Sequence, residues 1–509
     1  MRKIISSDAL WYLISLLALL LLAAINIYQP FLADQSVVIA GAKGIERGDV
    51  LYVDFWDNKM PGLFWFYWLA GKLFSFNEKG IHLFELVWML GFAAAMAVGL
   101  RRYLYFPWLS SVAPLAVIGI YYASAGANHL TLPEIIVCFP LFVCALFSMW
   151  AGQRADKVAT YFFISGLFAG ASVVFKLIFA PICVAFWLVS CGFIVSRERR
   201  SLGWLVRSAF LPVSGGVTLI LSLVVIKFAL DGALAELLWT AFSYPNEALA
   251  GSPFAGMQRL FVSSMYIATR YAVWLVPICV AIYAWFKSEK DIFTTTMLAW
   301  LVVGLAVILV QRFSWWGYHF FLIFPPLGLL GVRGIDVLVK KLTNGELSAR
   351  AISAILALTF ILPLVSIANE KAEIAIVTLV FEDKPVTHYR SFVRRDYAVA
   401  LASTKFLRQN ESLPGDIIVF GDPLYYHLGN RYPAIPMLGW PWEYFLQSQW
   451  LALPAQIEAA AAPYIFIADR EMKMMEKRGG GVKEFIFSRY IALHRAQEGT
   501  WLQIKREFR

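Results

Sequence analysis

The stretch GDVLYVDFWDNKMPG, residues 48–62, follows the first long apolar run of the chain and leads into the aromatic segment PGLFWFYWLAGKLF. It places three charged residues, Asp54, Asp57 and Lys59, beside an apolar surface. Two interpretations are open. The charges are either solvated side chains of a surface turn, with the aspartates capping turns or helices, or parts of a polar site at the membrane edge.

The composition around this stretch is that of an integral membrane protein. Of 509 residues, 60% are hydrophobic and only 15% are charged, and the mean hydropathy is +0.65. Apolar runs recur along the first three quarters, each long enough to cross roughly 30 Å of hydrocarbon as a helix. The first run, residues 10–27, is too long and too evenly apolar for a cleaved signal, so we expect it to remain as the first span.

The net charge of +10 does not indicate a nucleic-acid partner, because much of the excess lies in short basic clusters between apolar runs. If the N-terminus is inside, these clusters recur after every second span. This pattern predicts eleven spans with the C-terminus outside. The expected spans are residues 10–29, 81–100, 109–124, 133–151, 158–175, 178–196, 207–229, 266–286, 292–310, 319–338 and 351–368.

Two regions fall outside these spans. Residues 61–76 are apolar but short, which favours a re-entrant or interfacial helix over a full span. Charged residues return at 369–373, where we expect a membrane module, residues 1–368 with its first outer loop at 30–80, to give way to a periplasmic α/β domain, residues 369–509. The expected elements of that domain are a helix, YAVALASTKFLRQN, and the strands DIIVFG, PYIFIAD and GTWLQIK.

All five cysteines lie inside apolar runs, so they are expected to be small core residues and not a disulfide framework. The fold class predicted from these features is an α-helical polytopic membrane protein with a C-terminal extracytoplasmic α/β domain.

The expected outer face gathers ionisable residues. Asp34 follows the first span in FLADQSVV, and the loop holding Asp54, Asp57 and Lys59 comes next. Carboxylates and a lysine at the membrane edge suit the transfer of a group from a lipid-linked phosphate donor, because one carboxylate can deprotonate an acceptor hydroxyl and a cation can stabilise the leaving phosphate.

Further candidates on the same face are each weaker alone. Lys176, in ASVVFKLIFAP, is explained equally well by snorkelling to the interface or by phosphate binding. His129 and Glu134, in GANHLTLPEI, form either a capping arrangement at a helix start or part of a site, with capping favoured for Glu134. The remaining candidates, Arg312, Tyr318 and His319 in QRFSWWGYHFF, lie among aromatic residues of an interfacial belt.

The order of these motifs resembles that of the polytopic GT-C glycosyltransferases, specifically bacterial family 39-like proteins related to the lipid A aminoarabinose transferase and the protein O-mannosyltransferases. The resemblance covers nearly the whole chain, and the DFWDNKMPG loop is its most specific part. Its other parts are an acid soon after the first span, GLFAGASVVFK, HFFLIFPPLGLL, and a strand followed by LYYHLGNRYPA.

The resemblance implies a polyprenyl-phosphate sugar as donor. It implies Asp34 as general base, Lys59 at the donor phosphate, and Asp54 and Asp57 at the acceptor or sugar. The mannosyltransferase pattern has a second acid after the first, where this chain has Gln35, so Asp54 and Asp57 remain substitutes for the base. Lys176, Arg312 and His319 are expected near the donor phosphate, with His129, Glu134 and Tyr318 as further candidates.

The expected function is therefore inverting glycosyl transfer to a glycan, lipid or protein acceptor at the outer face of a bacterial inner membrane. A transporter or flippase of a lipid-linked envelope precursor is the alternative, and a non-catalytic scaffold leaves the first loop unexplained. A divalent cation held by Asp34, Asp54 and Asp57 is compatible with their oxygen ligands, but their spacing does not decide for or against it.

Overall fold

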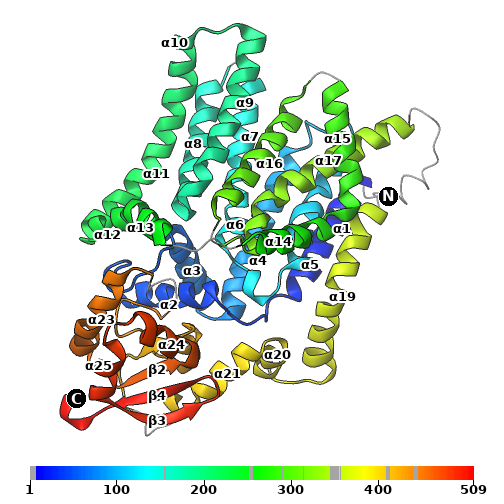
Figure 1. Ribbon diagram of the computed structural model, residues 1–509. Helices are drawn as coiled ribbons and strands as arrows, with labels where there is room; N and C mark the ends of the chain where they lie inside the picture. The colour runs from blue at the N-terminus through cyan, green and yellow to red at the C-terminus, as the bar shows by residue number, and fades with distance from the viewer. Residues whose placement is uncertain are drawn as a thin grey trace. The chain divides into compact units, whose positions relative to one another are not determined.

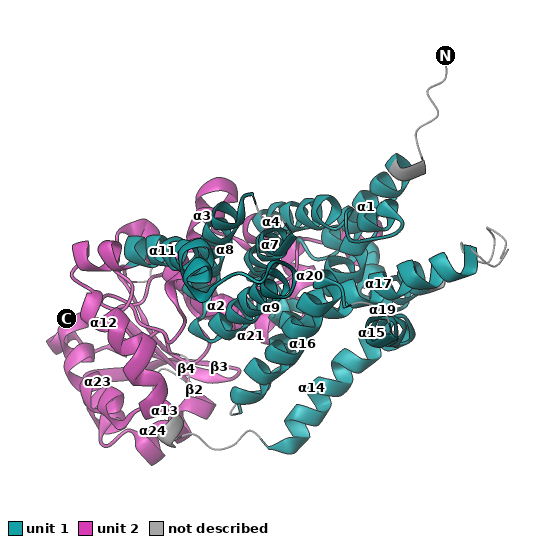
Figure 2. Ribbon diagram, turned by 90° about the horizontal axis from the view of Figure 1, so that it is seen from above, with its two compact units in different colours: residues 1–27, 82–224, 253–377 teal, residues 28–81, 225–252, 378–509 magenta. Residues whose placement is uncertain are grey.

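The computed structural model divides the chain into two compact units. It describes residues 7–153, 156–251, 256–287, 290–312, 314–343, 355, 357–408, 413–439 and 445–509 (Figure 1). The first unit comprises residues 1–27, 82–224 and 253–377, and the second comprises residues 28–81, 225–252 and 378–509 (Figure 2). The second unit therefore joins most of the expected first outer loop to the C-terminal region.

The first unit is helical. Helix α7 packs against α8 and α9, α9 packs against α16, and α17 packs against α15 and α16. Its elements are α1 (Ser7–Ala24), α4 (Glu78–Gly99, which starts in the second unit), η1 (Pro107–Ser111), η2 (Leu115–Gly119), α5 (Ile120–Ser124), η3 (Ala127–His129), α6 (Pro133–Ile136), α7 (Cys138–Gln153), α8 (Val158–Phe175), η4 (Leu177–Phe179), α9 (Ala180–Glu198), α10 (Leu202–Leu205), η5 (Val206–Phe210), α11 (Leu211–Leu230, which ends in the second unit), α14 (Met257–Arg270), η7 (Ala272–Trp274), α15 (Leu275–Lys287), α16 (Ile292–Val310), η8 (Gly317–Ile323), α17 (Phe324–Thr343), η9 (Ala357–Ile361) and α19 (Leu362–Ile376).

Seven helices in the described part of the chain are long and apolar enough to cross a membrane, or eight if a pair bent by 66° counts as one span. The bent pair, Met257–Arg270 and Ala272–Lys287, includes the expected span 266–286. The first expected span is the shorter apolar helix α1, and the expected span 109–124 is divided among η1, η2 and α5. The expected span 351–368 falls partly outside the described residues.

The second unit begins with two helices of 14 residues each, α2 (Asp34–Arg47) and α3 (Pro61–Phe74), that pack against each other. Gly48 caps the C-terminal end of α2, and its φ of 107° is the left-handed conformation that glycine adopts readily at helix ends. Pro61 occupies the first turn of α3, where its fixed φ suits a helix and its missing N–H costs nothing. At Gly41 a Cβ atom would lie 2.5 Å from Phe55, so the close packing requires glycine.

Helix α3 has 14 residues, which is shorter than a span of roughly 20 residues. The expectation of a short helix over residues 61–76 is therefore confirmed, while its relation to the membrane stays a prediction.

The C-terminal part of the second unit contains a four-stranded sheet of order β1-β2-β4-β3, in which β1 and β2 are parallel and the other pairs antiparallel (Figure 1). The expected strands are confirmed as β1 (Ile418–Phe420), β2 (Tyr464–Ala468) and β4 (Gly499–Ile504). The expected helix is α21 (Arg395–Ser403), continued by η11 (Lys405–Arg408). Strand β3 (Tyr490–Ala496) was not predicted, because five of its seven residues are exposed and it lacks a buried apolar run.

The remaining elements of the second unit are short helices. They are α12 (Leu234–Leu238), η6 (Trp239–Ser243), α13 (Tyr244–Gly251), η10 (Val377–Phe381, which starts in the first unit), α20 (Val386–Val393), α22 (Leu424–Gly429), α23 (Gln447–Ala460), α24 (Asp469–Arg478), α25 (Val482–Arg489) and η13 (Arg506–Phe508).

Candidate functional site

Three of the predicted residues meet in the second unit. The ammonium of Lys59 lies 3.1 Å from Asp34 Oδ1 and 3.1 Å from Asp57 Oδ1. The backbone N–H of Lys59 also donates to Asp57 Oδ1 at 2.8 Å. Asp34 is the first residue of α2, where the helix dipole favours a negative charge. We call these three residues the Asp34–Lys59–Asp57 cluster.

The loop that carries Asp57 and Lys59 is held by its own backbone and by its neighbours. The Tyr52 hydroxyl donates to the carbonyl oxygen of Lys59 at 2.7 Å. The N–H of Trp56 donates to the carbonyl oxygen of Pro436 at 2.7 Å, and its indole N–H donates to Thr240 Oγ1 at 3.0 Å. Segments far apart in the sequence therefore fix the residue next to Asp57.

Burial and the neighbouring charges shift the pKa values of this cluster in opposite directions. Burial raises the pKa of Asp57, which is 1% exposed, while the Lys59 ammonium opposes that rise. Burial opposes the charge on Lys59, but the carboxylates of Asp34 and Asp57 outweigh it and raise the pKa of Lys59. The side chain of Asp34 is 21% exposed, so it is the more accessible carboxylate of the two.

The side chain of Asp54 bonds to its own turn and not to Lys59. Its side chain is exposed, and Oδ2 accepts a hydrogen bond from the backbone N–H of Val50 at 2.7 Å. This contact closes the turn that precedes Phe55. The geometry therefore favours the turn-capping interpretation for Asp54, whereas Asp57 belongs to the charged cluster.

The geometry does not fit a divalent ion shared by the three aspartates. Lys59 already places a positive charge between Asp34 and Asp57, and the Asp54 carboxylate binds the turn. Within the described ranges, no group of three or more His, Cys, Asp and Glu side chains is arranged to hold a metal ion.

A second polar cluster lies in the first unit. Lys176 follows α8, and its ammonium donates to Glu134 Oε1 at 2.9 Å and to Gln311 Oε1 at 2.7 Å. His319 Nε2 lies 3.9 Å from the same Glu134 oxygen. Glu134 and His319 are buried, while Lys176 is 33% exposed. The structure thus brings together three predicted residues with one, Gln311, that was not predicted.

The other predicted residues of this unit are aromatic neighbours or surface groups. The ring of His129 lies 6.2 Å from that of Tyr318, and the ring of Tyr318 lies 4.6 Å from that of His319. Arg312 is exposed beside Gln311. His129 and Tyr318 therefore connect to the Lys176 cluster through His319, as an aromatic belt would.

A third group in the second unit was missed by sequence reasoning. Glu78 Oε2 lies 3.1 Å from Arg390 and 3.6 Å from His427 Nε2, and the Lys43 ammonium donates to His427 Nδ1 at 3.1 Å. Arg390 also donates to the carbonyl oxygen of Tyr28 at 3.2 Å. These contacts tie α20 to Tyr28, which precedes Asp34, and tie α22 to Lys43 of α2. Both helices also contact Glu78. The quoted motif LYYHLGNRYPA contains His427, but its partners lie too far away in sequence to be seen.

Comparison with solved structures identifies the fold. The crystal structure of ArnT from Cupriavidus metallidurans bound to undecaprenyl phosphate matches with a TM-score of 0.65, covering 99% of both chains at 11% sequence identity. The chain has the GT-C fold. The apo state of the same ArnT matches the GT-C chain described here with a TM-score of 0.62 at 13% identity, covering 98% of each chain.

A more distant GT-C relative is similar over part of its own length. The oligosaccharyltransferase AglB from Archaeoglobus fulgidus, in complex with an inhibitory peptide and a dolichol-phosphate, matches with a TM-score of 0.50 at 11% identity. The match covers 98% of this chain and 74% of AglB. No family model and no curated protein sequence matches the chain. The structural likeness therefore confirms the GT-C resemblance at the level of the fold.

Proposed function

We propose that this protein is a membrane glycosyltransferase that moves a sugar from a polyprenyl-phosphate donor to an acceptor hydroxyl of an envelope glycan, lipid or protein. The observation that carries the proposal is the Asp34–Lys59–Asp57 cluster, a lysine held between two carboxylates in a GT-C fold. The undecaprenyl phosphate bound to ArnT supports a lipid phosphate as part of the donor.

In the proposed reaction, Asp34 takes the proton from the acceptor hydroxyl, because it is the more accessible carboxylate of the cluster. The acceptor oxygen then forms a bond to the anomeric carbon, and the bond from that carbon to the donor phosphate oxygen breaks. The electron pair leaves with the polyprenyl phosphate, which gains one negative charge. A single displacement of this kind inverts the anomeric configuration.

Lys59 is proposed to stabilise that new charge. Its ammonium lies within hydrogen-bonding distance of three carboxylate oxygens, Asp34 Oδ1 and both oxygens of Asp57. A phosphate oxygen would therefore share or replace one of these contacts when the donor binds. Asp57 is proposed to position Lys59, since it accepts from both the ammonium and the backbone N–H of that residue. Lys176, with Glu134 and His319, remains a second candidate for binding the anionic part of the donor, and Arg312 a weaker one.

We further propose that the protein resides in the bacterial inner membrane and that the transfer takes place on its periplasmic side. A transporter built from inverted repeats would be expected to contain paired broken helices. The described ranges contain one such broken span, formed by Met257–Arg270 and Ala272–Lys287, where a pair of them would be expected. The transporter or flippase alternative therefore gains no specific support.

The test uses purified full-length protein in proteoliposomes with a radiolabelled polyprenyl-phosphate sugar and an envelope extract as acceptor source. The proposal predicts label in the acceptor together with release of polyprenyl phosphate. Movement of the labelled lipid across the bilayer without sugar transfer would overturn the proposal and favour a flippase. Mass spectrometry of envelope glycans from a deletion strain would then identify the sugar and the acceptor.

A further inference from the structure

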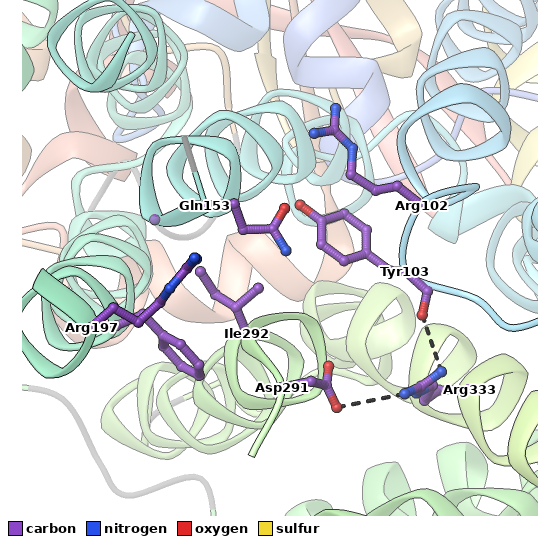
Figure 3. Close-up of a pocket in the computed structure, with 9 residues that line it drawn as sticks. Arg102, Tyr103, Gln153, Arg197, Asp291, Ile292 and Arg333 are labelled. Atoms are coloured by element: carbon purple, nitrogen blue, oxygen red, sulfur yellow. Dashed lines mark hydrogen bonds and ion pairs between the residues drawn. The ribbon is translucent and has the colours of Figure 1, made fainter. Parts of the chain in front are cut away.

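A cavity of about 320 Å³, with several charged side chains in its lining, opens among helix ends in the first unit (Figure 3). Several candidate membrane spans contribute to it, each close to one of its ends. Arg102 follows α4, Gln153 ends α7, Arg197 lies in the last turn of α9, and Asp291 caps the start of α16. The cavity is also lined by Tyr103 and by Arg333 of α17.

This cavity and the Lys176 cluster lie at opposite ends of the same helices. Glu134 lies before α7, Lys176 lies before α9, and Gln311 follows α16. The cavity contains residues from the other end of each of these helices. Since α16 has 19 residues, a rise of 1.5 Å per residue separates its two ends by about 28 Å. The cavity therefore belongs to the membrane face opposite to the Lys176 cluster.

The cavity carries an excess of positive charge. Its lining has three guanidinium groups and one carboxylate, that of Asp291. Asp291 is already bonded to the N–H and hydroxyl of Thr294, both at 2.8 Å, and lies 3.8 Å from Arg333. Arg333 in turn donates to Asp336 at 2.7 Å. The one lining carboxylate is thus committed to a helix cap and to Arg333.

The other two arginines make no ion pair with any carboxylate in the described part of the chain. Arg102 lies over the ring of Trp150, with the guanidinium carbon 4.3 Å from the ring centroid. Stacking covers one face of a guanidinium and leaves its in-plane N–H donors able to bind an oxyanion. Arg197 is exposed at the rim. In Figure 3, the ring of Tyr103 and the amide of Gln153 point toward each other between Arg102 and Arg197.

Cation–aromatic pairs surround this end of the helical unit. Lys290 lies 4.9 Å from the ring centroid of Trp285, and Lys340 lies 3.5 Å from that of Tyr105. The guanidinium carbon of Arg333 lies 4.7 Å from the Tyr105 ring centroid. Basic and aromatic side chains of this kind gather at the headgroup level of a membrane, and basic residues favour the cytoplasmic side. A lipid phosphate is the anion found at that level of a membrane.

We propose that the cavity is a binding site for the headgroup of an anionic phospholipid. The phosphate would contact Arg197 and Arg102, and Gln153 and Tyr103 would donate to its oxygens or to the headgroup hydroxyls. A volume of about 320 Å³ accommodates a headgroup and leaves the acyl chains on the outer surface of the helices. The site does not depend on the proposed glycosyl transfer, because it lies at the other end of the helices from the Lys176 cluster and contains no residue of the Asp34–Lys59–Asp57 cluster.

The test is native mass spectrometry of the purified full-length protein, titrated with phosphatidylglycerol or phosphatidylcholine. The variants are Arg197→Gln and the double variant Arg102→Gln/Arg197→Gln. Arg101→Gln is the matched control. Arg101 is exposed beside Arg102 and is not among the residues that line the cavity, so this substitution removes the same charge outside the proposed site. The unfolding midpoint without lipid is measured for each protein, so that a folding defect is recognised.

We expect one tight phosphatidylglycerol site in the parent protein and in Arg101→Gln. Arg197→Gln should bind it about tenfold more weakly and the double variant more weakly still. Binding of phosphatidylcholine should be weak and equal in all of them. Equal phosphatidylglycerol binding by Arg197→Gln and Arg101→Gln would overturn the proposal. Displacement of the lipid by inorganic phosphate at similar concentration would also overturn it, since the site would then bind soluble phosphate.

Discussion

The ammonium of Lys59 and the carboxylate of Asp34 are 3.1 Å apart, although α2 and the whole following loop separate them in sequence. The packing of α3 against α2 brings them together, and Gly41 permits it by giving room to Phe55 and Phe64. The same lysine bonds the buried carboxylate of Asp57. A carboxylate and a cation are thereby held side by side within the second unit, as the proposed transfer requires.

Replacement of Lys59 by alanine should strongly reduce sugar transfer. Loss of a positioned group that stabilises developing charge typically costs about 10²–10³-fold in rate. It would also leave Asp57 buried without its cation, so the unfolding midpoint should fall. Lys72→Ala is the matched control, since Lys72 is also a lysine of this region but forms an exposed pair with Glu46 at 2.8 Å. Equal transfer by the two variants would rule out the role of Lys59.

Asp54→Ala should leave transfer within roughly twofold of the parent, because the exposed carboxylate is bonded to the turn. Loss of that hydrogen bond should lower the free energy of unfolding by about 1 kcal/mol. Transfer rates and denaturant unfolding of the same preparation check both values. A loss of transfer comparable to that of Lys59→Ala would place Asp54 in the reaction after all.

Substitutions of Lys176 and Glu134 should have strongly coupled effects on the free energy of unfolding. Lys176→Met leaves the buried Glu134 carboxylate without its cation, a change that typically costs about 3–5 kcal/mol. Glu134→Gln should restore much of that loss in the double variant, since the charge is gone. A double-mutant cycle of unfolding free energies in detergent measures this coupling. Additive effects of the two substitutions would contradict the contact.

Asp422 should make stability depend on pH. Burial raises its pKa to about 6 from the usual 3.8, even though its Oδ1 accepts from the N–H of Leu424 at 2.9 Å. A raised pKa in the folded state means that the folded protein holds the proton more tightly. The protonated Asp422 therefore adds to the free energy of unfolding. This stabilisation is fully present below pH 3.8 and is lost as the pH rises through about 6.

Thermal unfolding of the parent and of Asp422→Asn across this range measures that contribution. The difference between the two midpoints, parent minus variant, should fall between pH 4 and 6 and stay level above pH 7. A difference that does not change with pH would show that Asp422 titrates normally.

Elements with a continuous apolar signal could be predicted from the sequence. Strands β1 and β2 are buried along most of their length, and α3 begins at a proline and is mostly apolar. Strand β3 carries mostly exposed residues and pairs through a register shift between Ala492 and His494, so its sequence offered no buried face. The division of residues 109–124 into short helices was also missed, because hydropathy reports apolar character and not hydrogen-bond pattern.

The candidate site was predictable where charge marks it. Lys59, Asp57 and Asp34 stand out as ionisable groups beside apolar runs, and the structure brings them together. Gln311 was missed because a neutral amide carries no such signal, and only the fold shows that it accepts from Lys176. His427 was missed because its partners Glu78 and Lys43 come from the other end of the chain.

The most direct test of the account is the transfer rate of Asp34→Asn in proteoliposomes, with binding of polyprenyl phosphate measured on the same preparation. Asparagine keeps the size and the hydrogen-bonding oxygen of the side chain but cannot take the acceptor proton. Transfer should fall by about 10²–10⁴-fold, while polyprenyl phosphate should still bind. Transfer at the parental rate by Asp34→Asn would contradict the proposed role of Asp34 as the base.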